Sequence, residues 1–109
     1  MKLNIDMDSD DSLLKKLNEL VEECTQLHMH LQRKEQLPRK FTDEDRSRLE
    51  IFQGDLKKLM VEMGIYGEQF LAELNNSPFL VYTQDEKINT RDLRRCLKLL
   101  VAFRSTYSP

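Results

Sequence analysis

The sequence predicts an all-α protein, an antiparallel three-helix bundle. Apolar residues recur at alternating steps of three and four along most of the chain, which is the spacing of one face of an α-helix. Only three glycines and three prolines occur in 109 residues, fewer than the turns of a β-rich domain need. At this length a single helical domain, residues 1–109, is expected, with residues 1–8 flexible.

The first helix is expected to begin at Ser9 or Ser12, since a serine side chain caps free backbone N–H groups and the neighbouring acids favour the positive end of a helix dipole. It should end near Gln36, because Pro38 disfavours helical geometry at Leu37. Its apolar seam comprises Leu13, Leu17, Leu20, Cys24, Leu27 and Leu31.

The second helix is expected from Thr42 to Leu74 and would be the longest element, reaching past the first. Thr42 precedes three acids, an N-terminal signature. Gly64 followed by Ile65 resembles a helix stop, which would give four helices. The apolar seam keeps its phase through both Gly64 and Gly67, however, and this favours one helix with a bend. The seam comprises Leu49, Phe52, Leu56, Leu59, Met63, Tyr66 and Phe70.

The third helix should follow an extended segment near residues 78–84, where an apolar run of strand-like composition has no partner strand. Asn89 or Thr90 is the expected cap, with Asp92 in the first turn. The seam comprises Leu93, Cys96, Leu100, Phe103 and Tyr107. Further apolar residues surround this seam, so the third helix is expected to be the most buried.

No motif in the sequence predicts catalysis. Cys24 and His28 are four residues apart on one helical face and form half of a zinc site, but the spacing predicts no second half. His28 and His30 point away from each other on a helix. There is no nucleophile motif and no glycine-rich phosphate loop. We therefore expect neither an enzyme nor a metal or other cofactor.

The sequence indicates the cytoplasm. The N-terminus is acidic and lacks the apolar region of a secretory signal. No apolar run approaches the ~20 residues that span a bilayer, so no membrane association is expected. Cys24 and Cys96 both fall within helical patterns, as buried free thiols of a reducing compartment do, and a bridge between helices is the alternative.

Charge is unevenly distributed in a chain of net charge −2. Residues 1–25 carry seven acids and three bases, whereas residues 87–109 carry six bases and one acid. These two blocks would attract each other within the fold or across a homodimer. A nucleic acid is a further partner for the basic block, although the acidic balance of the whole chain disfavours it.

Two surfaces are candidates for binding a protein partner. A basic stripe on the third helix comprises Arg91, Arg94, Arg95 and Lys98. A second apolar face lies beside the seam of the second helix, and its candidate binding residues are Val61, Ile65 and Tyr66. The expected function is that of a small non-enzymatic helical interaction protein, such as a regulator, inhibitor, adaptor or secretion-type chaperone. The alternative is a nucleic-acid-associated regulator that uses the basic stripe.

Overall fold

The structure is a computed structural model that describes residues 2–37, 39–74 and 88–107, with side chains from residue 12 onward. It contains the helices α1 (Lys2–Gln36), α2 (Asp43–Glu62), α3 (Ile65–Glu73) and α4 (Arg91–Tyr107). The all-α prediction is confirmed. The extended segment predicted near residues 78–84 lies outside the described residues.

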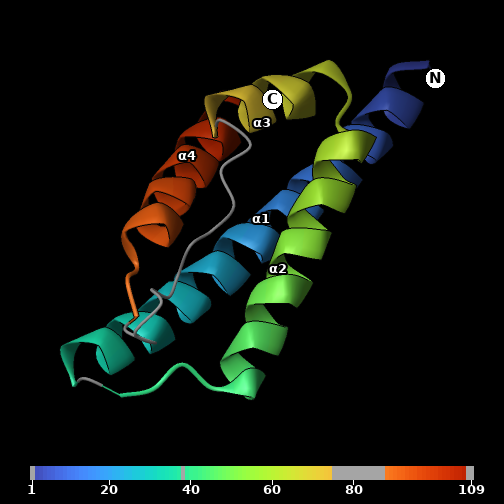
Figure 1. Ribbon diagram of the computed structural model, residues 1–109. Coiled ribbons are helices and arrows are strands. Elements are labelled where there is room, and N and C mark those ends of the chain that lie inside the picture. The colour runs from blue at the N-terminus through green and yellow to red at the C-terminus, as the bar shows by residue number, and fades with distance from the viewer. Residues whose placement is uncertain (1, 38, 75–87, 108–109) are drawn as a thin grey trace.

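The central element is α1, along which both α2 and α4 pack (Figure 1). The chain reverses between α1 and α2, and the first residues of α4 lie at the last turn of α1, so both helices run antiparallel to α1. The predicted seam of α1 is buried between them, with Leu17, Cys24 and Leu31 inaccessible to solvent. The bundle arrangement thus depends on the first helix, against which both of its neighbours pack.

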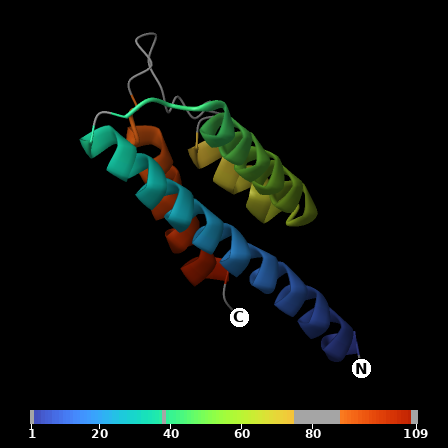
Figure 2. The same ribbon diagram turned by 90° about the horizontal axis from the view of Figure 1, so that it is seen from below.

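The length of α1 differs from the prediction at one end only. It ends at Gln36 as expected but begins at Lys2, so the predicted start at Ser9 or Ser12 is wrong. Residues 2–11 contain neither glycine nor proline, so no helix-breaking residue stops the helix from extending past the serines toward the N-terminus. At 35 residues α1 is longer than α2, and its first turns extend past α4 (Figure 2). The flexibility of residues 1–8 stays a prediction.

The helix predicted from Thr42 to Leu74 is broken at Gly64, so the four-helix alternative is correct and the continuous helix is wrong. Gly64 has φ +62°, a left-handed conformation that side chains disfavour and glycine tolerates. After it, α3 folds back across the end of α2 (Figure 1). The reversal keeps Phe70 in the core but turns Tyr66 out of the predicted seam.

The crossing of α3 over α2 depends on Gly67. A Cβ atom at this position would overlap the Met60 carbonyl oxygen and lie 2.6 Å from the carbonyl carbon. The backbones of α2 and α3 therefore approach closer than any side chain allows. The seam keeps its phase through Gly64 and Gly67 because α2 and α3 contribute buried residues to the same core.

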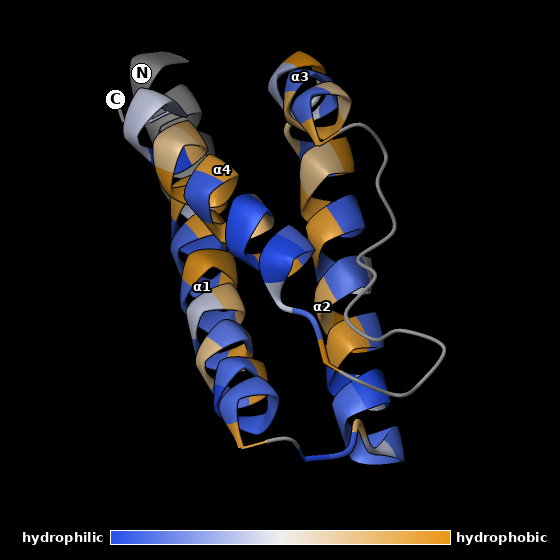
Figure 3. Ribbon diagram, turned by 60° about the vertical axis from the view of Figure 1, so that its left-hand side comes forward, coloured by the Kyte–Doolittle hydropathy of each residue, from blue (hydrophilic) through white to orange (hydrophobic). Residues whose placement is uncertain are grey.

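The start of α4 agrees with the prediction, but its burial does not. The Asn89 Oδ1 atom accepts a hydrogen bond from the Arg91 backbone N–H at 2.9 Å, and the Arg94 N–H donates to the Thr90 carbonyl. Leu93, Cys96 and Leu100 are buried, whereas Val101 is 39% exposed. With three buried residues among its 17, α4 is not the most buried helix, and Figure 3 shows its first turns as mainly hydrophilic.

We predict opposite effects of alanine at two glycines. Gly67→Ala should lower the free energy of unfolding by about 1–3 kcal/mol, because backbone atoms of Met60 occupy the space of the new methyl group. Gly54→Ala should raise it by up to about 1 kcal/mol, since Gly54 lies inside α2 and no atom lies within 4 Å of the position that its new methyl group would take. Urea unfolding measures both. Equal shifts in the same direction would contradict the close crossing.

Candidate functional site

The candidate apolar residues of the second helix gather where α2 meets α3. Val61 is 78% exposed, Ile65 is 65% exposed and Tyr66 is 55% exposed. We call these three residues the apolar corner. Because Gly64 reverses the chain between them, one member belongs to α2 and two belong to α3. All three side chains are more than half exposed, so the candidate residues of the predicted second apolar face lie on the surface.

Aromatic contacts hold the corner against α4. The rings of Tyr66 and Tyr107 meet edge to face with centroids 5.8 Å apart. Below them, the Phe70 and Phe103 rings lie 5.3 Å apart, and Phe103 also contacts Tyr107. Tyr66 is therefore fixed on one side and open to solvent on the other. A large aromatic side chain held in this way loses little conformational entropy when it binds a partner.

The basic stripe is exposed along α4, and its four members have different surroundings. The Arg95 Nη2 atom donates a hydrogen bond of 3.0 Å to the carbonyl oxygen of Glu73, which ties α4 to the last turn of α3. Arg94 lies close enough to His28 to affect its titration. No described residue forms an ion pair with Arg91, Arg94 or Lys98. Arg95 thus has a structural contact with α3, whereas the charged groups of Arg91, Arg94 and Lys98 are exposed to solvent.

No ion pair joins the two oppositely charged blocks among the residues whose side chains are described. Thr90 donates two hydrogen bonds of 2.8 Å to the Glu35 carboxylate, from its backbone N–H and its hydroxyl group. This contact places the basic first turns of α4 beside the last turns of α1, far from its acidic start. The attraction between the two blocks, within the fold or across a homodimer, stays a prediction.

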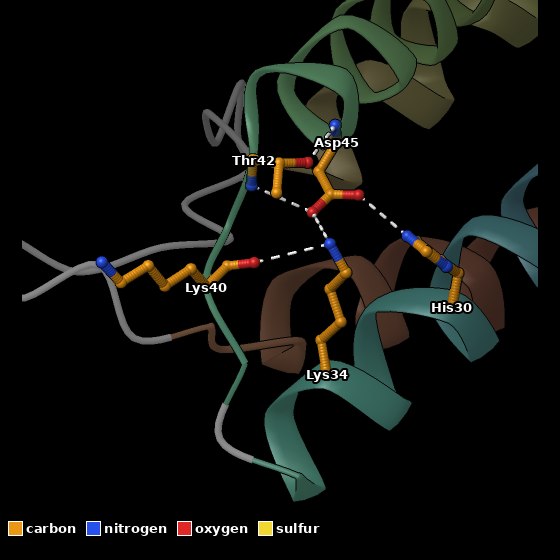
Figure 4. A network of polar contacts seen from close by, with 5 residues as sticks. All are labelled: His30, Lys34, Lys40, Thr42 and Asp45. Carbon is orange, nitrogen blue, oxygen red and sulfur yellow. Dashed lines mark hydrogen bonds and ion pairs between the residues drawn. The ribbon is translucent and has the colours of Figure 1, made fainter.

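A buried carboxylate joins the end of α1 to the start of α2 (Figure 4). Asp45 is 2% exposed and accepts hydrogen bonds from Lys34 and, at 2.8 Å, from the ring of His30. Thr42 and Asp45 also form a reciprocal capping box, with bonds of 3.0 and 3.2 Å. The sequence predicted the Thr42 cap. No pattern in the sequence predicted the contacts of Asp45 with α1, because they depend on the path of the connecting loop.

The charge of Asp45 is stabilised by its partners. Burial alone would raise the pKa of its carboxyl group, but the hydrogen bonds from Lys34, Thr42 and His30 outweigh burial and hold this pKa well below the usual value. The arrangement satisfies a buried charge with several donors, as a structural ion pair requires. We assign it to the stability of the α1–α2 turn.

The cysteines and His28 lie together in the interface between α1 and α4. Cys24 and Cys96 are buried free thiols, as predicted. A hydrogen bond from Cys96, together with burial, raises the pKa of the Cys24 thiol far above its usual value. The buried Nε2 atom of His28 has no hydrogen-bond partner among the described residues. Burial and the nearby Arg94 charge lower the pKa of His28, against the influence of Glu35. Both shifts favour the neutral forms of the Cys24 thiol and the His28 imidazole.

A small groove of about 280 Å³ separates α1 from α2, and its lining is Lys16, Glu19, Leu20, Glu23, Asp55, Lys58, Leu59 and Glu62. Lys16 and Glu62 span it with a 3.0 Å ion pair. Partial burial and the neighbouring Asp55 carboxylate raise the pKa of Glu23. Among the residues whose side chains are described, no group of three or more His, Cys, Asp or Glu side chains has the arrangement to hold a metal ion.

Comparisons with known proteins give no relative for this chain. No protein-family model, no curated protein and no solved structure matches it. None of the described helices combines the length and the apolar character needed to cross a membrane. Function must therefore be inferred from the surfaces of the fold itself.

We predict that Asp45→Asn lowers the free energy of unfolding by about 1–3 kcal/mol at neutral pH, because Lys34 and His30 lose a charged acceptor. The pKa of Asp45 is lower in the folded than in the unfolded protein, so its stabilising contribution is present above the unfolded pKa and is lost as the pH falls toward the folded one. Urea unfolding between about pH 5 and pH 3 should thus show a shallower pH dependence in the variant.

Asp43→Asn is the matched control for this measurement, because Asp43 lies in the same first turn of α2 but is exposed. It should change stability by no more than a helix-dipole contribution, about 0.3–1 kcal/mol. Equal losses in the two variants would show that the contacts of Asp45 with α1 contribute nothing specific.

Proposed function

We propose that this chain is a small non-enzymatic interaction protein that acts by binding a protein partner, in the manner of a regulator, inhibitor, adaptor or secretion-type chaperone. The observation that carries the proposal is the apolar corner. Its three large side chains lie more than half exposed at the junction of two helices. Clustered exposed apolar groups cost solubility in a monomer and are typical of binding surfaces.

The form of the corner supports binding more than catalysis. Its side chains are aliphatic or aromatic, and Tyr66 is held in place by Tyr107. Tyrosine is one of the residue types that most often dominate the binding energy of a protein interface. The titratable groups with shifted pKa values lie elsewhere, in the α1–α4 interface, the α1–α2 turn and the α1–α2 groove.

The basic stripe would add selectivity to such binding. Arg91, Arg94 and Lys98 present exposed positive charge on one side of α4. Charges at the rim of an interface accelerate association with a partner of opposite sign and discriminate against others. An acidic protein surface is therefore the favoured partner. We also propose a reducing compartment such as the cytoplasm, and the neighbouring free thiols of Cys24 and Cys96 support this proposal.

Nucleic acid is the second candidate partner, and the exposure of the basic stripe is the observation that favours it. The stripe carries no interleaved aromatic side chain on which a base would stack, and the whole chain has a net charge of −2. The protein partner is the stronger proposal for these two reasons.

Quantitative affinity capture from native lysate tests the proposal. The wild-type chain should retain a protein in stoichiometric amount, and Ile65→Asp should lose at least about 90% of it, because a charge replaces an apolar contact at the corner. Leu37→Asp is the matched control, since Leu37 is similarly exposed just past the far end of α1 and should leave capture unchanged.

Three results would contradict the proposal. Wild-type chain that retains no specific protein would exclude a stable partner in that lysate, and equal losses in the two variants would exclude the corner as the binding surface. Loss of all retained protein after nuclease treatment would support the nucleic-acid candidate in place of a direct protein contact.

A further inference from the structure

Cys24 and Cys96 face each other in the contact between α1 and α4. Both side chains are completely shielded from solvent. Among the described helices α4 packs mainly against α1, so the buried side of α4 that carries Cys96 is turned toward α1. A hydrogen bond between the two thiols brings the sulfur atoms into contact. The chain contains no other cysteine, so each thiol has one candidate partner within its own chain.

The pair lies in the middle of the helix contact. On both helices a buried leucine lies three or four residues before and after the cysteine: Leu20, Leu27, Leu93 and Leu100. The distance between two packed helices depends on the size of the side chains at their contact. Two small cysteine side chains that meet there permit a close approach of the backbones. A disulfide requires such an approach, with Cα atoms within about 7 Å of each other.

Oxidation is the chemistry that this pair of thiols favours. No third His, Cys, Asp or Glu completes a metal site around the pair among the residues whose side chains are described. The two sulfur atoms are held together by the packing of α1 and α4, so each is the nearest nucleophile for the other. Neighbouring thiols in this arrangement exchange with an external disulfide to form a bond between themselves.

We propose that oxidation joins Cys24 to Cys96 in a reversible disulfide that locks α4 onto α1. The oxidant is a small-molecule disulfide. One cysteine attacks it as a thiolate and releases the first small thiol, and the other cysteine then attacks the mixed disulfide and releases the second. The two S–H bonds of the chain are thus exchanged for one S–S bond, and the two protons and two electrons convert the oxidant into two thiols. In a reducing compartment both cysteines stay free until conditions become oxidising.

Burial makes the separation of α4 from α1 a step of this reaction. A small molecule cannot reach a thiol that has no exposed surface. The hydrogen bond from Cys96, together with burial, raises the pKa of the Cys24 thiol and keeps it protonated while the helices are packed. The oxidant therefore reacts when α4 has separated, and the bond closes when the thiols meet again. The bond then closes a chain segment of about 70 residues and lowers the entropy of the unfolded chain.

The lock would affect both candidate binding surfaces, because α4 contributes to each of them. Tyr107 in the last turn of α4 contacts Tyr66 of the apolar corner. The basic stripe lies along the same helix. A helix that is fixed on α1 holds these side chains in place and so reduces the entropy cost of binding. This consequence rests on the proposed function, whereas the disulfide itself does not.

Equilibration of the purified chain in glutathione buffers of increasing oxidation tests the proposal. Alkylation followed by intact-mass spectrometry should show that both thiols are lost together. The product should be a single chain that is lighter by two hydrogens and carries no glutathione. In the native state the reaction should be at least about tenfold slower than in the urea-unfolded chain, because it requires the opening of α4.

Amide hydrogen exchange distinguishes a lock from a bond without structural effect. Oxidation should slow the exchange of amides between Leu93 and Leu100 at least about tenfold, since a cross-linked α4 cannot separate from α1. Cys96→Ala is the matched control, because it removes one thiol and should make this exchange equal in reducing and oxidising buffers. The mass measurement on the wild-type chain decides the question even where this variant folds poorly.

Capture of a partner tests the consequence of the lock. From a lysate freed of small thiols, the oxidised chain at limiting concentration should retain at least about twice as much protein as the reduced chain. Equal capture by the two forms would contradict the effect of the lock on binding.

Three results would overturn the disulfide lock. They are thiols that stay free in the most oxidising buffer, bonds that join two chains in place of one, and a disulfide that leaves the exchange of α4 unchanged. A chain that forms the bond but captures no protein contradicts the proposed function alone. Free thiols in a chain that does capture a protein contradict this inference alone.

Discussion

The structure depends on the burial of one apolar seam from two sides. Leu20, Cys24 and Leu27 of α1 lie between α2 and α4, and all three are almost completely shielded from water. Each shielded leucine contributes about 1.5–3 kcal/mol relative to an exposed one. Both α2 and α4 pack along α1, so the antiparallel arrangement follows from the burial of this seam.

Two polar contacts set the ends of this arrangement. Asp45 joins α2 to His30 and Lys34 near the end of α1, and Glu35 receives both donors of Thr90 at the start of α4. Both contacts lie in the last turns of α1, so they fix the level at which each neighbouring helix begins. The opposite end of the bundle is closed by aromatic side chains of α3 and α4, where exposed Ile65 and Tyr66 remain available for binding.

Periodicity and capping chemistry predicted the helices and most of the core. The seams of α1 and α4, the Thr42 cap and the end near Gln36 were all visible in the sequence, because they depend on local spacing. The break at Gly64 was visible as an alternative only. A short helix that folds back and returns Phe70 to the same core leaves the seam in phase, and local spacing cannot distinguish this from a bend. The close contact of Gly67 with Met60 decides between a bend and a reversal, and local spacing does not predict it because it joins two different helices.

The ion pairs of Asp45 and the contact between Cys24 and Cys96 were likewise not predictable, since each joins different helices. The basic stripe and the apolar corner were predicted by residue, and both lie on the surface.

Residue-level amide hydrogen exchange is the most direct measurement of whether α1 is the element on which the fold depends. Amides in the part of α1 from Leu17 to Leu31 should exchange slowest, at rates set by global unfolding, because their side chains contact both neighbouring helices. Those of α3 should exchange fastest among the four helices, since nine residues after a glycine reversal pack with few buried side chains. Slowest exchange across a continuous stretch from Thr42 to Leu74, with α1 less protected, would contradict this account.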